Sequence, residues 1–266
     1  MSGSVLVACA AVWGAAAGVL LPRAAYRFSV PSEEDWRERC PGGHAIRGWI
    51  GWARCAECTA DPSSTGPSAH LMESYSSSAP LPATPPPSYG PNTPLLATVT
   101  ALLCAALAAV TGSRPELGVW LLIVPVGVLL AVVDLRVQRL PDVLTLPLAA
   151  TALVLLGLVA LLPGHAGDWT TALLGALALG AGYFVLFLIN PSGMGFGDVK
   201  LALGAGAVLG WYGWQAVLLG TFAGFVFGAL YGGALVVVRK AGRKTAIPFG
   251  PFLLAGAYTG LLVGAA

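Results

Sequence analysis

Residues 118–134 read GVWLLIVPVGVLLAVVD, an uncharged run that ends in Asp134. A second stretch, PSGMGFGDVKL at residues 191–201, places Asp198 at the start of another apolar run. Acidic side chains are costly inside apolar segments of membrane length, and they rarely persist there without a role. Neither acid has an obvious cationic partner, which favours one shared site. Two carboxylates that share a proton can activate a water molecule.

Composition excludes an ordinary soluble domain. The 266 residues are 56% hydrophobic and 10% charged, with a mean hydropathy of +0.78. Several apolar stretches are long enough to cross a hydrocarbon core of about 30 Å as helices, and the 35 glycines suit close helix packing in lipid. The sequence predicts an all-α, polytopic membrane protein with about eight transmembrane helices. They are expected at 4–21, 94–112, 118–134, 143–162, 169–190, 198–213, 214–238 and 247–265.

The first apolar stretch, residues 4–21, has two interpretations. It has the length of a cleaved signal peptide, but the segment Met1 to Leu21 contains no Lys or Arg, and a signal peptide begins with a basic region. A retained first helix is therefore the favoured interpretation.

Basic loops set the expected orientation, because Lys and Arg accumulate on the cytoplasmic side. With eight helices, the loops after the first, third and seventh helices fall on one side, and both termini face outward. Asp134 and Asp198 then lie at the cytoplasmic ends of the third and sixth helices. The net charge of +2 is small, and no nucleic-acid partner is expected. The basic residues of these three loops are Arg23, Arg27, Arg37, Arg39, Arg47 and Arg54; Arg136 and Arg139; and Arg239, Lys240, Arg243 and Lys244.

Four domains are predicted along the chain. Residues 1–22 form the first transmembrane helix, and residues 23–61 form a small cytoplasmic segment that contains cysteines. Residues 62–94 are rich in Pro and Ser and cannot bury a core, which is typical of a disordered linker. Residues 95–266 form a membrane-embedded catalytic domain.

The cytoplasmic segment holds a candidate metal site. Cys55 and Cys58 have the two-residue spacing of a zinc knuckle, and Cys40 lies a plausible distance upstream. A four-cysteine site requires another Cys near Gly43, which is absent, so His44 is the candidate fourth ligand. Ordinary reduced thiols are the alternative, because a cytoplasmic position argues against a disulfide. The remaining cysteines, Cys9 and Cys104, lie in apolar helices and are explained by packing.

A carboxylate pair has a specific chemistry. Two acids brought close cannot both ionise, so they hold one proton between them. One then acts as a base toward water while the other protonates or polarises the scissile carbonyl. Gly195 and Gly197 permit unusual backbone angles and a close approach of a substrate strand. The alternative is that these glycines are packing notches, and that Asp198 pairs with Lys200 or caps its helix.

Three segments resemble the type IV prepilin peptidases, the GxGD-type aspartic proteases of bacterial membranes. They are residues 195–201 (GFGDVKL), 134–142 (DLRVQRLPD) and 247–252 (IPFGPF), and the resemblance covers about residues 95 to 266. It implies that Asp134 and Asp198 are the catalytic residues. Gly195, Gly197, Lys200, Pro141 and Asp142 would support the catalytic loops.

The resemblance also implies a substrate and a location. Family members cut a short basic leader from prepilin or pseudopilin-like precursors at the cytoplasmic face of the bacterial inner membrane, in type IV pilus or protein secretion systems. Proteolysis requires no cofactor. Many members also N-methylate the new terminus with S-adenosylmethionine, an activity associated with an N-terminal domain that has two CxxC pairs. Here the first pair is broken at Cys40-Pro41-Gly42-Gly43, so only a structural zinc site of reduced ligand number is expected.

Other functions remain open. A transporter or scaffold could use Asp134 and Asp198 as ion or proton sites, although such sites lie near the bilayer midplane and often in internal repeats. A GxGD protease with a different substrate is a second alternative. A Ser/His protease is excluded, because no His lies on a membrane helix at the depth of a Ser. No membrane helix carries the paired His and Glu of a metalloprotease.

Overall fold

The computed structural model describes residues 2–31, 33–60, 88–191, 193–238 and 248–266. Within these ranges the chain forms helices and no strand, apart from two isolated bridges, so the predicted all-α class is confirmed. Most of the predicted 62–94 linker, the basic cluster at 239–244, and Ile247 lie outside the described residues. The helices are α1 (Gly3–Phe28), α2 (Ala56–Ala60), α3 (Thr93–Thr111), α4 (Glu116–Val137), α5 (Asp142–Val159), α6 (Trp169–Ile189), α7 (Phe196–Trp211), α8 (Trp214–Val237) and α9 (Gly250–Ala265).

Eight of these helices match the eight predicted ones to within a few residues, except at the end of α1. Six of them, α1, α3, α4, α5, α6 and α8, are long and apolar enough to cross a membrane. Helices α7 and α9 have 16 residues each. Such a helix rises about 24 Å, less than a hydrocarbon core of about 30 Å. The polytopic membrane class is therefore confirmed, whereas the number of spans is not fixed at eight.

Helix α1 runs on to Phe28, beyond its predicted end at residue 21. The sequence-based interpretation that Arg23 and Arg27 follow the helix is therefore wrong, because both lie in its last two turns. Loop carbonyls explain this: the Arg23 guanidinium donates to the carbonyl oxygens of Arg47, Ile50 and Trp52, and Arg27 donates to that of Gly48. The sequence alone places these two arginines in a loop, whereas in the structure they lie on the helix and donate hydrogen bonds to the loop.

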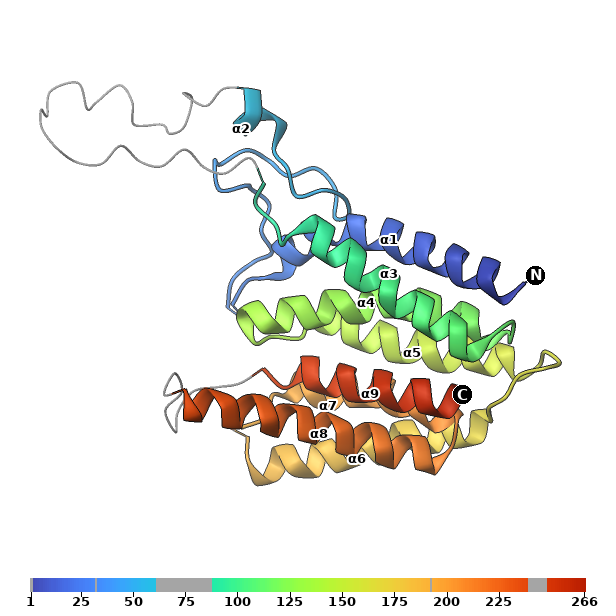
Figure 1. Ribbon diagram of the computed structural model, residues 1–266. Coiled ribbons are helices and arrows are strands. Elements are labelled where there is room, and N and C mark those ends of the chain that lie inside the picture. Colours follow the sequence, from blue (N-terminus) through green and yellow to red (C-terminus); the bar gives the residue numbers. More distant parts are fainter. Residues whose placement is uncertain (1, 32, 61–87, 192, 239–247) are drawn as a thin grey trace, which may run out of the picture.

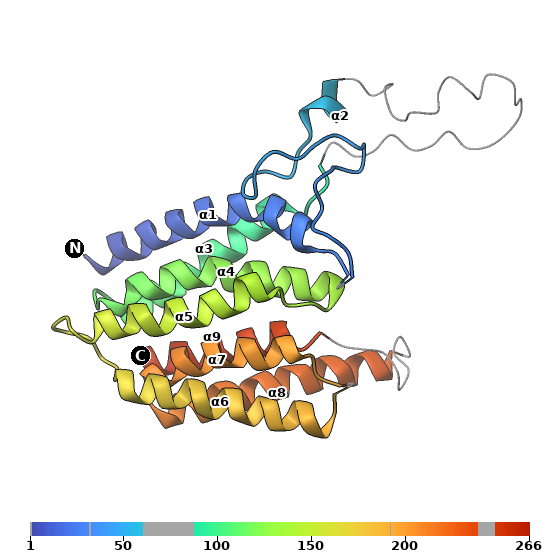
Figure 2. The ribbon, with the colours of Figure 1, turned by 180° about the vertical axis from the view of Figure 1, so that it is seen from behind.

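The long helices lie along one common direction, and both chain ends lie at the same end of the bundle (Figure 1). Seen from behind, α1, α4 and α5 lie on one side and α6, α7, α8 and α9 on the other (Figure 2). Three pairs pack most closely, namely α1 with α3, α6 with α7, and α8 with α9. In the α6–α7 pair, a methyl group added at Gly175 would lie 2.6 Å from the Gly206 carbonyl oxygen. Glycine thus allows the backbones to approach as expected in lipid.

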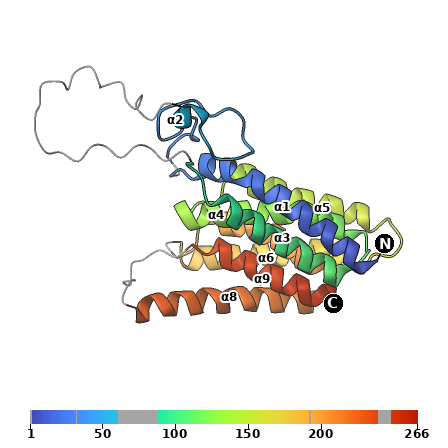
Figure 3. The ribbon, with the colours of Figure 1, turned by 45° about the horizontal axis from the view of Figure 1, so that its top comes forward.

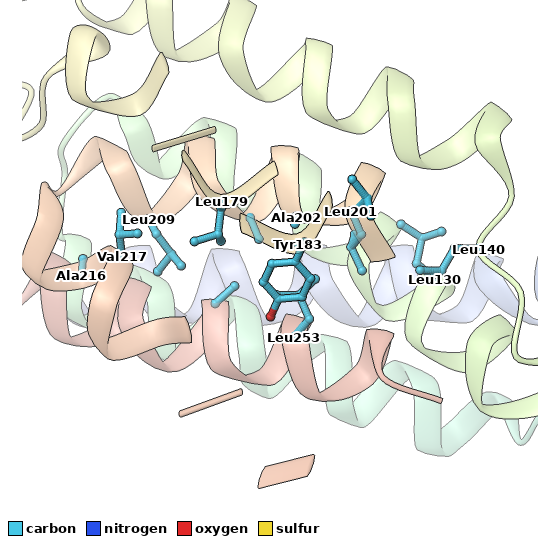
Figure 4. Packing of buried hydrophobic residues seen from close by; sticks show 13 residues of the cluster. Leu130, Leu140, Leu179, Tyr183, Leu201, Ala202, Leu209, Ala216, Val217 and Leu253 are labelled. Atoms are coloured by element: carbon cyan, nitrogen blue, oxygen red, sulfur yellow. The ribbon is translucent and has the colours of Figure 1, made fainter. Parts of the chain in front are cut away.

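Buried side chains join the two sides of the bundle. One core cluster follows α7 and extends from Leu140, at the end of the bundle where α4 meets α5, to Ala216 near the opposite end (Figure 4). Tyr183 of α6 lies in the middle of this cluster, next to Leu253 of α9. Helix α7 is buried along nearly its whole length. The helix that carries Asp198 in its first turn is therefore held in place by α5, α6, α8 and α9.

Candidate active site

Asp134 lies in the last turn of α4, with 4% of its surface exposed. Its carboxylate accepts a hydrogen bond of 3.0 Å from the backbone N–H of Gly250, the first residue of α9. A methyl group added at Gly250 would lie 2.8 Å from the Asp134 Oδ2 atom. Only glycine at this position therefore lets the helix terminus approach the acid so closely.

Asp198 lies in the first turn of α7 and is 6% exposed. Its Oδ2 accepts a hydrogen bond of 3.1 Å from the N–H of Gly195, so the carboxylate caps its own helix. Gly195 has a φ of −75°, and neither it nor Gly197 adopts a positive φ. Neither glycine therefore supplies the unusual backbone angles that the sequence suggested. Gly197 provides space, because a methyl group there would lie 2.9 Å from the Leu140 Cβ, whereas one at Gly195 would meet Asp198 at an ordinary 3.5 Å.

The two acids lie at the same end of the bundle, on helices from its two sides, and the charge of Asp134 acts on Asp198. Leu140 lies between their supporting glycines. A methyl group added at Gly197 would lie 2.9 Å from the Leu140 Cβ, and one added at Gly250 would lie 3.4 Å from its Cδ1. The buried Leu140 side chain thus lies next to Gly250, which donates to Asp134, and next to Gly197, which directly precedes Asp198.

The other predicted support residues surround this pair. The Lys200 ammonium binds the Asp142 carboxylate at 2.6 Å and lies 4.9 Å from the centre of the Phe196 ring. Lys200 therefore pairs with Asp142 across α5 and α7. Of the two roles that the alternative interpretation gave Asp198, the pair with Lys200 is not present, whereas the cap of its own helix is. Pro141 is the N-cap residue of α5, and its carbonyl accepts the first hydrogen bond of the helix from the Thr145 N–H.

Three residues next to the acids were not given a role by the sequence. The Gly250 amide and the Leu140 side chain depend on contacts between distant segments, for which a single sequence carries no signal. Tyr183 is the third: its hydroxyl is buried, has no hydrogen-bond partner among the described residues, and lies within the electrostatic reach of Asp198. Its ring packs against Phe225 and Phe249. In the sequence, the only sign of such a role is that Tyr183 brings a polar hydroxyl into the apolar stretch that forms α6.

The predicted metal ligands Cys40, His44, Cys55 and Cys58 come together. Their four ligand atoms lie within 4.8 Å of one another. The His44 Nδ1 lies 3.6, 3.5 and 3.2 Å from the sulfurs of Cys40, Cys55 and Cys58, and the sulfurs of Cys40 and Cys58 are 3.6 Å apart. A tetrahedral zinc with ordinary bond lengths requires such ligands to be about 3.5–3.8 Å apart. This donor set therefore fits zinc.

The thiols of this cluster are electrostatically linked. Burial opposes ionisation of Cys55, but hydrogen bonds, first from the Cys58 N–H and then from the thiols of Cys58 and Cys40, lower its pKa to about 7. Burial and the hydrogen bonds to the other two cysteines raise the pKa of Cys58 to about 12. The outer nitrogen of His44 faces the Glu57 carboxylate at 3.6 Å, an arrangement that orients histidine ligands.

The cysteine-containing segment is attached to the bundle at two places. One is α1, through Arg23 and Arg27. The other is Arg139, in the loop that follows Asp134, which donates to the Pro31 carbonyl at 2.7 Å and lies 4.8 Å from the centre of the Trp36 ring. Arg139 directly precedes Leu140, so this segment touches the loop that carries Leu140.

The fold and the site define a multi-pass membrane protein with two buried acids at one end of its helix bundle. Residues 120–233 match the type IV leader peptidase family. A prepilin leader peptidase/N-methyltransferase of Stutzerimonas stutzeri is 30% identical over 97% of this chain and 91% of its own length. The chain therefore belongs to the type IV leader peptidase family and is a multi-pass bacterial membrane protein.

Other relatives carry the same name. Those of Aeromonas salmonicida and Pseudomonas aeruginosa are 36% and 35% identical, over 64% and 66% of this chain. The aligned chain spans 58% and 59% of the lengths of these two relatives, less than two thirds. No solved structure matches the chain.

Proposed function

We propose that this protein is a membrane aspartic endopeptidase that removes the basic leader of type IV prepilin-like precursors. One observation carries the proposal: two buried carboxyls, from α4 and α7, lie at one end of the bundle, close enough for the charge of Asp134 to act on Asp198, and each accepts a hydrogen bond from a glycine N–H. Family membership supports the substrate class, because the relatives are named prepilin leader peptidases.

The proposed mechanism uses the shared proton of the pair. One of Asp134 and Asp198 takes a proton from a water molecule, which attacks the scissile carbonyl. The other acid donates its proton to the carbonyl oxygen as the tetrahedral intermediate forms, and a proton then passes to the leaving amine. The backbone N–H groups of Gly250 and Gly195 each donate a hydrogen bond to one carboxylate oxygen, which leaves the other oxygen of each acid for water or substrate.

The site is proposed to face the cytoplasm. Asp134, Asp198, Arg136 and Arg139 lie at the same end of the bundle as the cysteine-containing segment. A reporter fused after Gly164 should read external, and one fused after Lys244 should read cytoplasmic. The reverse result would place both acids on the wrong side for a cytoplasmic leader.

The decisive experiment is co-expression with candidate prepilin-like precursors, followed by mass determination of their new N-termini. We expect a shortened precursor that is absent when the same precursor is expressed alone or with the Asp198→Asn variant. An uncleaved precursor with every candidate substrate, from a protein that accumulates in the membrane, would refute the proposal. The same spectra report N-methylation, because a methylated terminus carries one additional methylene mass.

A structural zinc site is proposed in addition, held by Cys40, His44, Cys55 and Cys58. The spacing of the four ligand atoms supports it. Zinc there would stabilise the segment by joining thiolates from separate positions, and would not activate the attacking water. Metal analysis of the purified full chain should give one zinc per molecule, and the Cys55→Ser, Cys58→Ser double variant should give none.

A further inference from the structure

The loop 47–54, with the sequence RGWIGWAR, has an unusual surface. Its three large apolar side chains are exposed: Trp49 at 41%, Ile50 at 65% and Trp52 at 54%. Arg47 and Arg54, at the two ends of the loop, are also exposed, and the loop contains no acid. Three large apolar groups within four residues mark an interaction surface, whereas single exposed ones do not.

The loop is fixed at a defined level along α1. The Gly51 N–H donates to the Leu20 carbonyl at 2.8 Å, and the Arg23 N–H donates to the Gly51 carbonyl at 3.1 Å. Residues 3–22 of α1 carry no charge and rise about 30 Å as a helix, the thickness of a hydrocarbon core. The level of Leu20 to Arg23 is therefore the boundary between hydrocarbon and head groups, and the loop is bonded to α1 there.

The loop also belongs to a segment on the outer side of the bundle. The chain that leads to α2 leaves from the end of α1 and lies beside that helix, away from α6, α7, α8 and α9 (Figure 1). The tilted view shows the same placement (Figure 3). In Figure 1 no described helix other than α2 lies beyond α1 on this side, so the segment is at the edge of the bundle.

The side chains of the loop suit this location. Tryptophan is enriched at membrane interfaces because its ring has an apolar body and a polar N–H. Arginine near the surface attracts anionic lipid. The Arg27 guanidinium lies 3.9 Å from the centre of the Trp49 ring, and that of Arg54 lies 5.4 Å from the Trp52 ring, so each indole has a cation beside it.

We propose that residues 47–54 form an interfacial anchor that inserts Trp49, Ile50 and Trp52 among the head groups of the membrane that the protein spans. Its partner is anionic phospholipid. The same segment also has an acidic stretch of surface, formed by the exposed Glu33, Glu34, Asp35 and Glu38. Anionic lipid would repel that surface, which makes it an internal control.

The test uses the full chain with a photocrosslinking amino acid at position 50, or at position 34 as the control. Each protein is placed in nanodiscs of phosphatidylcholine with or without phosphatidylglycerol, illuminated, and analysed by mass spectrometry. We expect several-fold more lipid adduct at position 50 than at position 34, and more still when phosphatidylglycerol is present. Equal adduct at the two positions, or crosslinking of position 50 to a second copy of the chain in place of lipid, would overturn the proposal.

The charges are tested separately with the Arg47→Gln, Arg54→Gln double variant, which retains the three apolar side chains. Lipid adduct at position 50 should persist in phosphatidylcholine, and the increase caused by phosphatidylglycerol should disappear. An unchanged increase would show that these arginines do not select anionic lipid. Neither side chain touches the two acids, so failure here is distinguishable from failure of the proposed peptidase function.

Discussion

The two clusters of chemically active residues in this protein are assembled in opposite ways. The hydrogen bond from Gly250 to Asp134 joins residues 116 positions apart, whereas the sulfurs of Cys40 and Cys58 are 18 positions apart. The acid pair depends on how whole helices pack. The cysteine cluster depends on one short segment, from Cys40 to Cys58, and on the zinc ion that it is proposed to hold. Changes in helix packing should therefore affect cleavage far more than changes in the cysteine cluster.

The largest expected effect is at the acids. Asp134→Asn or Asp198→Asn should lower the cleavage rate by several orders of magnitude, and the double variant should lose little more, because the two act as one unit. The measurement is the rate of leader removal in membranes that contain equal amounts of protein. Asp168→Asn is the matched control: this acid caps α6 at the opposite end of the bundle, and Asn caps equally well. Near-normal cleavage by either single variant would refute the assignment.

The next largest effect is expected where a glycine next to the site has no room for a side chain. Gly250→Ala and Gly197→Ala force a methyl group to within 2.8 Å of Asp134 and 2.9 Å of Leu140. A displacement of an acid by about 1 Å should slow cleavage roughly 10- to 100-fold. Gly195→Ala should be milder, because its methyl group meets Asp198 at an ordinary 3.5 Å, and Gly118→Ala, which meets nothing, should be neutral. If Gly195→Ala were the most damaging of the four, the glycines would have a role other than space.

A smaller effect on the cleavage rate is expected at Arg139, where the cysteine-containing segment contacts the loop after Asp134. Arg139→Ala removes the hydrogen bond to Pro31 and the contact with Trp36, and so loosens the loop that carries Leu140. A charged hydrogen bond contributes about 1.5–3 kcal/mol, and partial loss of loop order should slow cleavage about threefold to tenfold. Arg136→Ala, an exposed residue on the same side of the bundle, is the control and should cleave normally. Equal rates for the two variants would mean that the cysteine-containing segment does not affect the acids.

A still smaller effect is expected at the ion pair of Asp142 and Lys200. Asp142→Asn keeps an oxygen that accepts from the Lys200 ammonium, so the rate of cleavage should fall by less than about threefold. Asp142→Leu removes that acceptor and should cost more. Rates measured side by side decide the matter: a loss with Asn as large as that with Leu would indicate that the charge of Asp142 is itself required.

The smallest effect on cleavage is expected from the Cys55→Ser, Cys58→Ser double variant. It should lose its zinc and accumulate to a lower level, yet cleave at a rate per molecule close to that of the parent protein. Quantitative immunoblotting and the cleavage rate separate the two effects. A variant that accumulates normally but cannot cleave would show that the cysteine cluster is part of the protease, and that the division of the chain into an arm and a catalytic domain is wrong.

Sequence patterns predicted the helices well because apolar runs of membrane length allow few alternatives. Alternation of helix direction also placed Asp134 and Asp198 at one end before any contact was known. The errors arose where distant groups satisfy a charge or a donor. Arg23 is expected in a loop but is helical, with loop carbonyls as its partners, and nothing in the sequence indicates that Lys200 pairs with Asp142, which lies 58 positions away. Patterns within one segment cannot reveal such partners.

Leu140 has a consequence for how the family sequence can vary. Its side chain occupies the volume left by two absent side chains, at Gly197 and Gly250, which lie 53 positions apart in the chain. These three positions therefore share a fixed amount of space, and a larger residue at one of them requires a smaller residue at another. We expect them to covary among relatives, so that a residue larger than glycine at position 197 occurs with a residue smaller than leucine at position 140.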